Sequence, residues 1–443
     1  MLVLYLLLSV VAIIILTVRM KVHPFIALFL VAILYGLVAG MPLTKIISSV
    51  NDGFGNTLGK IGLIIVFGII IGAFLENSGG AYTIADRILR IIGRQRVVAA
   101  MGIIGYIVSI PVFADSGFLL LAPLNKSLSK KAGISLSGSA VALALGLTAT
   151  HTLVPPTPGP IAAAGILGAD LGIVMLLGLL ISALALIVGL FFAKGFVAKT
   201  YIDPDPEMSE EEMKARVVDA PGAIRSTLPI IVPIGLIVLK SVLHLMTSHP
   251  NEGIAGILSF VGEPVVALFI GMVLSLTLPK EFEFEMLSTK GWVGKSLVGA
   301  ATIILITGAG GIFGQVLQNS GIADVLSKSL GSVNLSLWLP FLLAAAIKTA
   351  QGSSTVALIS TASIMLPLMV PLGFVSEIDK AMVVIAVGAG SMVVSHANDS
   401  FFWVVTQLSG MDVKAGYRLF TTGTLILGIS AATFLFIASL VVR

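Results

Sequence analysis

Residues 146–170 read GLTATHTLVPPTPGPIAAAGILGAD, and they interrupt an apolar chain in a way that decides the fold. His151 is followed by three prolines within residues 155–158, and the apolar run resumes at Ile161. Proline has no N–H to donate and its ring clashes with the preceding turn, so this stretch does not continue as one helix. We therefore predict two half-helices separated by an unwound segment.

The composition places this break inside a membrane protein. Hydrophobic residues make up 57% of the chain and charged residues 11%, against roughly 25% charged residues in a soluble domain. Apolar runs of membrane-spanning length recur from Leu2–Val18 to Leu419–Val442. No cleavable signal peptide is apparent at the N-terminus. The sequence predicts an all-α polytopic protein of the cell (inner) membrane, with the lipid bilayer as its solvent.

Charge and cysteine content argue against several other classes. The net charge is +4, but the basic residues are scattered over short loops, which argues against a nucleic-acid partner. The chain has no cysteine, so disulfides and thiolate metal sites are excluded. No HExxH-type motif is present, and the Ser, His and Asp residues are spread over the whole chain. We therefore expect neither an enzyme nor a protein with a cofactor.

Weak internal similarity divides the chain into two halves. LENSGGA at 75–81 resembles LQNSGIA at 317–323, and THTLVPP at 150–156 resembles SHANDSF at 395–401, at nearly the same separation in sequence. The longest polar stretch is acidic and lies between the halves. We predict an N-terminal repeat over 1–200, a linker over 201–224 and a C-terminal repeat over 225–443.

Lysine and arginine counts indicate that the two repeats have opposite orientations in the membrane. Arg87, Arg90, Arg94 and Arg96 fill one loop, whereas the matching loop of the second half has Lys328 alone. Other matched loops show the reverse bias, and short cytoplasmic loops are enriched in these residues. The alternative is a coincidence among small counts. We predict inverted repeats, each with five crossings and a re-entrant hairpin, an extracytoplasmic N-terminus and a cytoplasmic linker.

Inverted repeats with broken helices are the architecture of secondary transporters. Unwound backbone at membrane depth is tolerated where protein buries it or where it lines an aqueous cavity. The half-helix that follows the break points its N-terminus at that place, which suits an anion, and Gly159 permits close approach. The alternative is a loop outside the membrane. The second half repeats the interruption at 395–400.

Two further interruptions predict the tips of the hairpins. VFADSGFLLLAPL at 112–124 places Asp115, Ser116 and Gly117 between apolar runs. AAAIKTAQGSSTVALIS at 344–360 does the same with a longer polar set, which comprises Lys348, Gln351, Gly352, Ser353, Ser354 and Thr355. N–H groups and hydroxyls at such tips can replace water around a polar solute.

Ionisable residues inside a bilayer are costly and are functional by default. We expect Lys348 to pair with a substrate carboxylate or with Asp115 or Asp399, unless it snorkels to the interface. The two aspartates are proton-carrier candidates, and the alternative for each is to cap a half-helix. His151 and His396 relay protons or bind hydroxyls, and the alternative is that each only fastens the broken helix.

Four stretches closely resemble the gluconate permease family, and the resemblance covers essentially the whole chain. They are ATHTLVPPTPGPIAAAGILGADLG (149–172), GGIFGQVLQNSGIADVL (310–326), AAIKTAQGSSTVALIS (345–360) and GAGSMVVSHANDSFFW (388–403). The resemblance implies proton symport of small hydroxylated organic acids such as gluconate, idonate or glycerate-type acids, with D-serine in one branch. It also implies homodimers whose transport domains move against a fixed scaffold. It maps the hairpin tips to 115–117 and 351–355 and the breaks to 155–160 and 395–400.

One departure from the family pattern concerns the substrate. Family members tend to carry a Glu-Val-Gly-like tip and an arginine where this chain has Asp115-Ser116-Gly117 and Lys348. A guanidinium grips a carboxylate with two parallel hydrogen bonds, whereas an ammonium is a point charge. Other sugar acids and shorter hydroxy acids therefore remain open as substrates.

Together these patterns predict a secondary transporter that imports a small hydroxylated organic acid, such as gluconate, with protons. A sodium-coupled carboxylate symporter, a carrier of D-serine or glycerate-type acids, and a passive channel are the alternatives. The predicted substrate-binding residues are Ser116, Gly117, His151, Thr157, Gly159, Lys348, Gln351, Ser353, Ser354, Thr355, His396 and Asn398. The predicted proton-coupling residues are Asp115 and Asp399.

Overall fold

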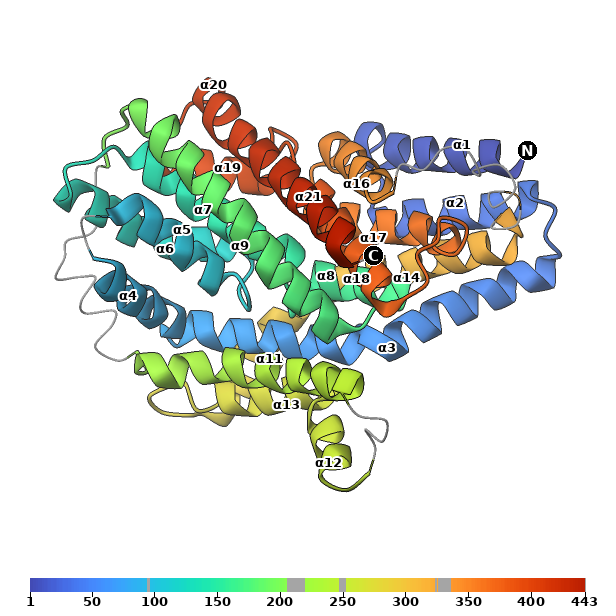
Figure 1. Cartoon of the computed structure of the whole chain (residues 1–443), viewed down its shortest axis with the longest axis horizontal. Helices are drawn as coiled ribbons and strands as arrows, with labels where there is room; N and C mark the ends of the chain where they lie inside the picture. The colour runs from blue at the N-terminus through green and yellow to red at the C-terminus, as the bar shows by residue number, and fades with distance from the viewer. Residues whose placement is uncertain (94–95, 205–219, 247–251, 323–324, 326–335, 443) are drawn as a thin grey trace.

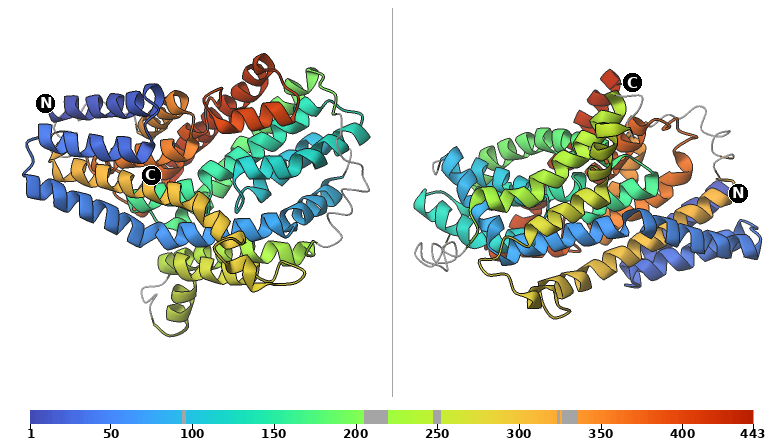
Figure 2. Two further views of the ribbon diagram at one scale, coloured as in Figure 1. Left: turned by 180° about the vertical axis from the view of Figure 1, so that it is seen from behind. Right: turned by 90° about the horizontal axis from the view of Figure 1, so that it is seen from below.

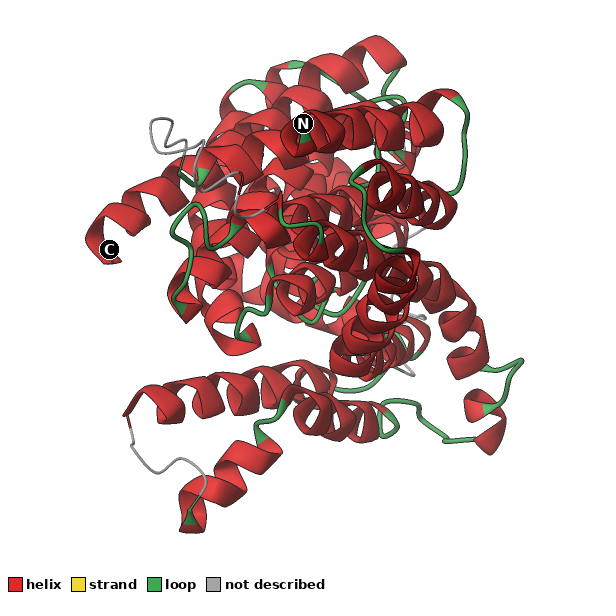
Figure 3. Cartoon of the chain, turned by 90° about the vertical axis from the view of Figure 1, so that its right-hand side faces the viewer, coloured by secondary structure: helices red, strands yellow, loops and turns green. Residues whose placement is uncertain are grey.

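The protein is described by a computed structural model, in which helices are joined by loops and turns (Figure 3). The structure describes residues 1–93, 96–204, 220–246, 252–322, 325 and 336–442. Within them, six helices are long and apolar enough to cross a membrane, and the bent pair Gly253–Val261 and Pro264–Ser275 makes a seventh span if it counts as one. The prediction of an all-α polytopic membrane protein is confirmed.

The first half of the chain contains nine α-helices within the described residues. They run from blue to green in Figure 1. They are α1 (Leu2–Ile14), α2 (Pro24–Val38), α3 (Leu43–Asn77), α4 (Gly80–Ile92), α5 (Val97–Val108), α6 (Ala114–Lys131), α7 (Leu136–Leu153), α8 (Pro158–Leu167) and α9 (Leu171–Gly195). The π-helical segment η1 (Ile15–Arg19) extends α1, and the 3₁₀ turn η3 (Val197–Lys199) follows α9.

The second half of the chain begins with α11. Its described helices are α11 (Ala223–Met246), α12 (Gly253–Val261), α13 (Pro264–Ser275), α14 (Trp292–Asn319), α16 (Trp338–Gln351), α17 (Ser354–Met365), α18 (Glu377–Ser391), α19 (Ser400–Leu408), α20 (Val413–Gly416) and α21 (Thr422–Val442). Three short segments, η4 (Phe284–Leu287), η5 (Leu366–Leu368) and η6 (Tyr417–Thr421), lie between them.

Fewer helices reach spanning length than the five per half that the sequence predicts. The reason is helix length: α1 has 13 residues and α2 has 15, whereas crossing the hydrocarbon core takes about 20. The predicted linker lies mostly outside the described residues, as does Lys328, on which one of the charge comparisons depends.

The long helices α3 and α14 cross in direct contact, on the side of the molecule where α1 and α2 lie (Figures 1 and 2). Glycines permit this approach: a Cβ atom on Gly53 would lie 2.6 Å from the carbonyl oxygen of Gly311. Small residues are the usual means by which helices approach closely in membranes. Each of these helices ends at the asparagine of its Asn-Ser-Gly motif, Asn77 in α3 and Asn319 in α14.

A hairpin of two shorter helices follows in each half. Helices α16 and α17 meet at Gly352 and Ser353, inside the predicted tip at 351–355. Helices α5 and α6 meet at residues 109–113, just before the predicted tip at 115–117. The turn forms early because Pro111 follows Val108 closely and the Ser109 hydroxyl donates a 3.0 Å hydrogen bond to the carbonyl of Val112. Residues 115–117 therefore form the first turn of α6.

Two broken helices come next, as the sequence predicts, but the breaks differ in length. Residues 154–157 separate α7 from α8, whereas residues 392–399 separate α18 from α19. His151 consequently lies within α7, while His396 lies in the unwound segment of the second half. The similarity between the two sequence stretches therefore does not place the two histidines at equivalent points. Residues 154–157 are all buried, so the first break lies deep in the protein.

Candidate functional site

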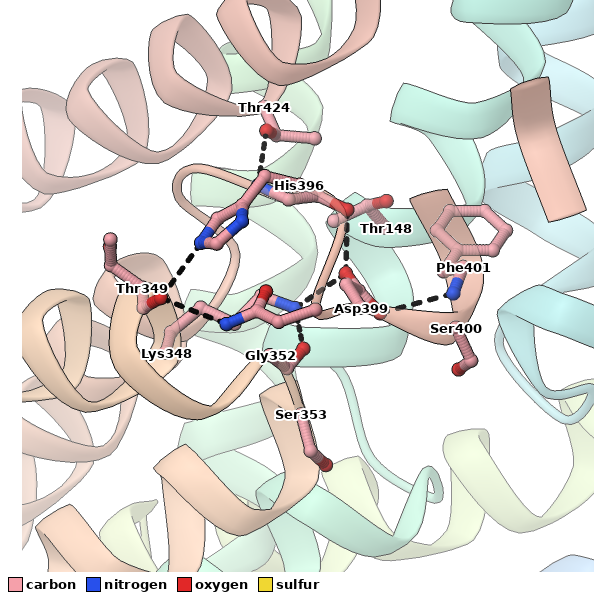
Figure 4. A network of polar contacts seen from close by, with 12 residues as sticks. Thr148, Lys348, Thr349, Gly352, Ser353, His396, Asp399, Ser400, Phe401 and Thr424 are labelled. Atoms are coloured by element: carbon pink, nitrogen blue, oxygen red, sulfur yellow. Dashed lines mark hydrogen bonds and ion pairs between the residues drawn. The ribbon is translucent and has the colours of Figure 1, made fainter. Parts of the chain in front are cut away.

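One cavity of about 490 Å³ lies where the two halves of the chain meet. The first half contributes the start of α6 and the last turns of α7. The second half contributes the α16–α17 tip, the unwound residues 392–399 and the start of α19 (Figure 4). Side chains that are far apart in sequence thereby share one polar space within a largely apolar protein.

Lys348 is the most buried charge in this cavity, with 1% of its surface exposed. Its ammonium group lies 2.6 Å from Oδ2 of Asp399 and also donates a hydrogen bond to the carbonyl oxygen of Gly352. An ammonium carries three donors, so one N–H remains beyond these two partners. Of the partners that the sequence suggests for Lys348, the structure pairs it with Asp399.

Asp399 is held from three directions. Its Oδ2 atom also accepts a hydrogen bond of 2.5 Å from the hydroxyl of Ser395, and its Oδ1 atom accepts one of 3.0 Å from the backbone N–H of Phe401. The last contact is the N-cap of α19. Asp399 is thus both the counter-ion of Lys348 and the cap of a half-helix, and it fixes the lysine against the second break.

The α16–α17 tip is fastened to the second break by further hydrogen bonds. The amide of Asn398 donates to the carbonyls of Thr349 and Ala350, each at 3.0 Å, and Nε2 of His396 lies 2.8 Å from the carbonyl of Thr349. Gly352 has a φ of +88°, and a Cβ atom there would collide with the backbone of Asn398. This tip therefore requires glycine, which has no side chain and readily adopts a left-handed backbone conformation.

Asp115 is the second carboxylate of the cavity and comes from the other half of the chain. It lies in the first turn of α6, is half-buried, and accepts a 3.1 Å hydrogen bond from the hydroxyl of Ser400. No ion pair to Asp115 exists within the described residues. This carboxylate therefore has room for a proton or for a donor from a ligand.

Two buried polar atoms of cavity residues have no hydrogen-bond partner in the described structure. They are Nδ1 of His151 and Nε2 of Gln351. The ring of His151 contacts the ring of Phe113, with 5.8 Å between the centroids. Buried polar atoms are nearly always paired, so each exception needs a reason. A ligand with polar groups supplies one here, because both residues line the cavity.

Three helix N-termini converge on the cavity, those of α6, α17 and α19. Such ends carry partial positive charge. Asp115 compensates it in α6 and Asp399 in α19, whereas α17 has only the neutral N-cap Ser353. The first turn of α17 is therefore the place in this cavity that best suits an anionic group.

Most of the predicted site residues lie in this cavity. Those that line it are Asp115, Ser116, His151, Lys348, Gln351, Ser353, Ser354, Thr355, Asn398 and Asp399. Four predicted residues do not. Gly117 and Gly159 face Leu147 and Leu358 in helix packing. The Thr157 hydroxyl donates to the carbonyl of Val154, and His396 stacks on Tyr417 beside the tip.

Sequence reasoning missed several lining residues. They are Phe113, Ala114, Thr148, Thr152, Gly352, Met392, Ser395, Ser400 and Phe401. Thr148 lies three residues before His151 on α7, and Thr152 lies four residues after Thr148, so helical spacing would have found them in turn. Ser395 and Ser400 stand inside the quoted stretch SHANDSF, in which the predicted site residues are only the histidine, the asparagine and the aspartate.

The chain is similar to known permeases over nearly its full length. Residues 1–441 match the model of a family described as GntP family permease. A gluconate permease of Pseudomonas aeruginosa is 35% identical over 442 residues, which cover 98% of this chain and 97% of that protein. The D-serine transporter DsdX of Escherichia coli O6:H1 is 32% identical over 448 residues, which cover 99% and 98%.

Among solved structures, the YdaH transporter of Alcanivorax borkumensis shares the fold. The TM-score is 0.64 at 15% sequence identity, and the match covers 93% of this chain and 97% of that one.

Proposed function

Because the chain belongs to the GntP family of permeases, we propose that it imports a small hydroxylated organic acid together with a proton. Family membership makes it a multi-pass permease of the inner membrane and not an enzyme. The identity of the substrate and the coupling ion are the proposed part. One observation supports both: the balance of charge in the cavity between the two halves.

The cavity holds one ammonium and two carboxylates. Lys348 and Asp399 neutralise each other at 2.6 Å, which leaves the carboxylate of Asp115 as the excess charge. A monoanionic acid would bring a second negative charge into a poorly hydrated space, which is unfavourable. A proton on Asp115 or Asp399 removes this obstacle. The charges that line the cavity thus support coupling of the anion to a proton.

The same residues suggest how the acid is oriented. Its carboxylate would meet the first turn of α17 and the third N–H of Lys348, because these are the donors without a fixed partner. Its hydroxyl groups would meet Nδ1 of His151 and the amide of Gln351, whose nitrogen atoms lack partners. Ser116, Thr148 and Thr355 supply further hydroxyls around the cavity.

We also propose that the two halves are inverted repeats that work by alternating access in a homodimer. The halves share an order of elements, namely a long helix, a hairpin and a broken helix, and both contribute to one cavity. In transporters this arrangement lets one part move against another around a central site. The distribution of lysine and arginine supports an extracytoplasmic N-terminus and a cytoplasmic linker over 201–224.

A second candidate substrate class is the small hydroxy amino acid. Asp115 has no cationic partner in the described structure, and an α-ammonium group would provide one. A zwitterion such as D-serine would then need no proton to balance its charge. The relative that carries D-serine makes this class worth testing beside the sugar acids.

Uptake into proteoliposomes tests the proposal. Labelled gluconate, glycerate and D-serine would be offered under an imposed pH gradient or sodium gradient, and counterflow would distinguish a carrier from a pore. We expect accumulation of at least one hydroxy acid that is driven by the pH gradient. Dependence on sodium, or uptake of D-serine alone, would contradict proton symport of a hydroxy acid.

A further inference from the structure

A second cavity lies apart from the first, where α4 packs against the start of α11, at the left of Figure 1. Its volume is about 770 Å³. Three arginines from the two helices line it, namely Arg87 and Arg90 from α4 and Arg225 from α11. None of the residues proposed for transport contributes to this cavity.

The charge in this cavity is strongly positive. Asp86 is its one acidic lining residue within the described part of the chain, and it pairs at 2.7 Å with Arg90, one turn further along α4. Neither Arg87 nor Arg225 forms an ion pair within the described residues. Three guanidinium groups against one carboxylate leave a net charge of about +2, which attracts an anion.

The rim of the same cavity is apolar. Ile224 and Leu228 line it and are 80% and 41% exposed. A ligand that satisfies both features has an anionic head and a hydrocarbon portion. Guanidinium groups bind phosphate oxygens with two parallel hydrogen bonds, and basic pockets between membrane helices suit lipid headgroups.

We propose that this cavity binds the phosphate headgroup of an anionic phospholipid of the cytoplasmic leaflet. The arginines hold the phosphate, and an acyl chain lies along Ile224 and Leu228. The lipid thereby joins α4, which leads into the first hairpin, to α11, which opens the second half. Arginine-rich loops favour the cytoplasmic side, so the site faces the leaflet whose anionic lipids attract basic protein segments.

Lipid binding to the full-length protein in an uncharged detergent tests this site without any transport assay. Native mass spectrometry and the melting temperature would be followed while dioleoyl phosphatidylglycerol or dioleoyl phosphatidylcholine is added. We expect phosphatidylglycerol to bind and stabilise, and phosphatidylcholine to do neither. In the double variant Arg87→Gln/Arg225→Gln, phosphatidylglycerol should bind roughly thirtyfold more weakly.

A control variant removes the same number of charges elsewhere. Arg19 and Lys194 are exposed and do not line the cavity, so Arg19→Gln/Lys194→Gln should bind the lipid like the parent protein. Equal loss of lipid in both double variants would mean that net charge alone governs binding, and it would overturn the proposal. So would stabilisation by inorganic phosphate equal to that by the lipid.

The acidic linker is the competing occupant, because Glu210, Glu211 and Glu212 precede the cavity in the chain. Replacing all three by glutamine distinguishes the two. An unchanged affinity for phosphatidylglycerol supports a cavity that is open to lipid. A gain of about tenfold or more would identify the linker as the resident ligand and overturn the proposal.

Discussion

The ammonium group of Lys348 lies 2.6 Å from the carboxylate of Asp399, although 51 positions separate the two residues in the chain. The lysine comes from the last turn of α16 and the aspartate caps α19, so this one contact joins a hairpin tip to a broken helix. Both side chains are nearly inaccessible to solvent, at 2% and 9%. Removing one partner alone would therefore leave a buried charge without its counter-ion.

Removing Lys348 should destabilise the protein strongly. Lys348→Met leaves a buried carboxylate without its counter-ion, at a cost of about 3–5 kcal/mol. The double variant Lys348→Met/Asp399→Asn should recover most of this loss, because asparagine is neutral and can still cap α19. Denaturant unfolding in detergent measures the free energies of unfolding of the parent protein, the single variant and the double variant.

An exposed ion pair provides the matched control. Lys130 and Asp203 lie 3.2 Å apart, and both side chains are 58% exposed. Lys130→Met should therefore cost less than about 1 kcal/mol. Equal losses for Lys130→Met and Lys348→Met would contradict the importance of the buried pair.

Asp115 should be needed for coupling and not for recognition. In Asp115→Asn the side chain can no longer take up a proton, so uptake should lose its acceleration by an imposed pH gradient. Counterflow of substrate should persist. Ser400→Ala is the control, since it removes the 3.1 Å hydrogen bond to Asp115 and leaves the carboxylate in place. Full gradient-driven accumulation by Asp115→Asn would move the coupling role to another residue.

His151 should contribute to ligand affinity without contributing to stability. Phenylalanine keeps the ring contact with Phe113 and removes a nitrogen that has no partner in the described structure. His151→Phe should therefore weaken substrate binding up to about tenfold, the value of one lost hydrogen bond. The melting temperature without substrate should stay the same or rise. A lower melting temperature would point to a structural role for the histidine.

The crossing of α3 and α14 should not tolerate a side chain at Gly53. Gly53→Ala places a methyl group 2.6 Å from the carbonyl oxygen of Gly311, and overpacking of this kind costs about 1–3 kcal/mol. Gly55 lies in the same helix with no atom near its Cβ position, so Gly55→Ala should stabilise by up to about 1 kcal/mol. Unfolding of the two variants side by side gives the comparison, and equal effects would argue against a tight crossing.

The sequence predicts where the helices break, because a continuous helix at membrane depth rarely tolerates clustered prolines or polar residues. Pro155 and Pro156 mark the first break, and Gln351 to Thr355 mark the second hairpin tip. The first tip is misplaced, since residues 109–113 are mostly apolar and resemble the helices on either side. The sequence analysis places the tip at the polar residues that follow, but Asp115 lies in the first turn of α6.

Partners within the site could be only partly predicted. A lone lysine among apolar residues predicts a buried counter-ion, but choosing between Asp115 and Asp399 requires the tertiary arrangement of α16 and α19. Pairing the two histidines by their spacing assumes breaks of equal length. The break in the second half is longer, so His396 ends beside Tyr417 and only His151 lines the cavity.

The two hairpins make different numbers of polar contacts with the second broken helix. We expect the cavity to open on the side with fewer contacts. Withdrawing the α16–α17 tip from residues 392–399 breaks the Lys348–Asp399 ion pair together with the hydrogen bonds made by His396 and Asn398. Parting α6 from α19 breaks one described side-chain hydrogen bond, between Ser400 and Asp115. We therefore expect a solute to enter and leave past Asp115, so the carboxylate proposed to take up the coupled proton lies on the entry path itself.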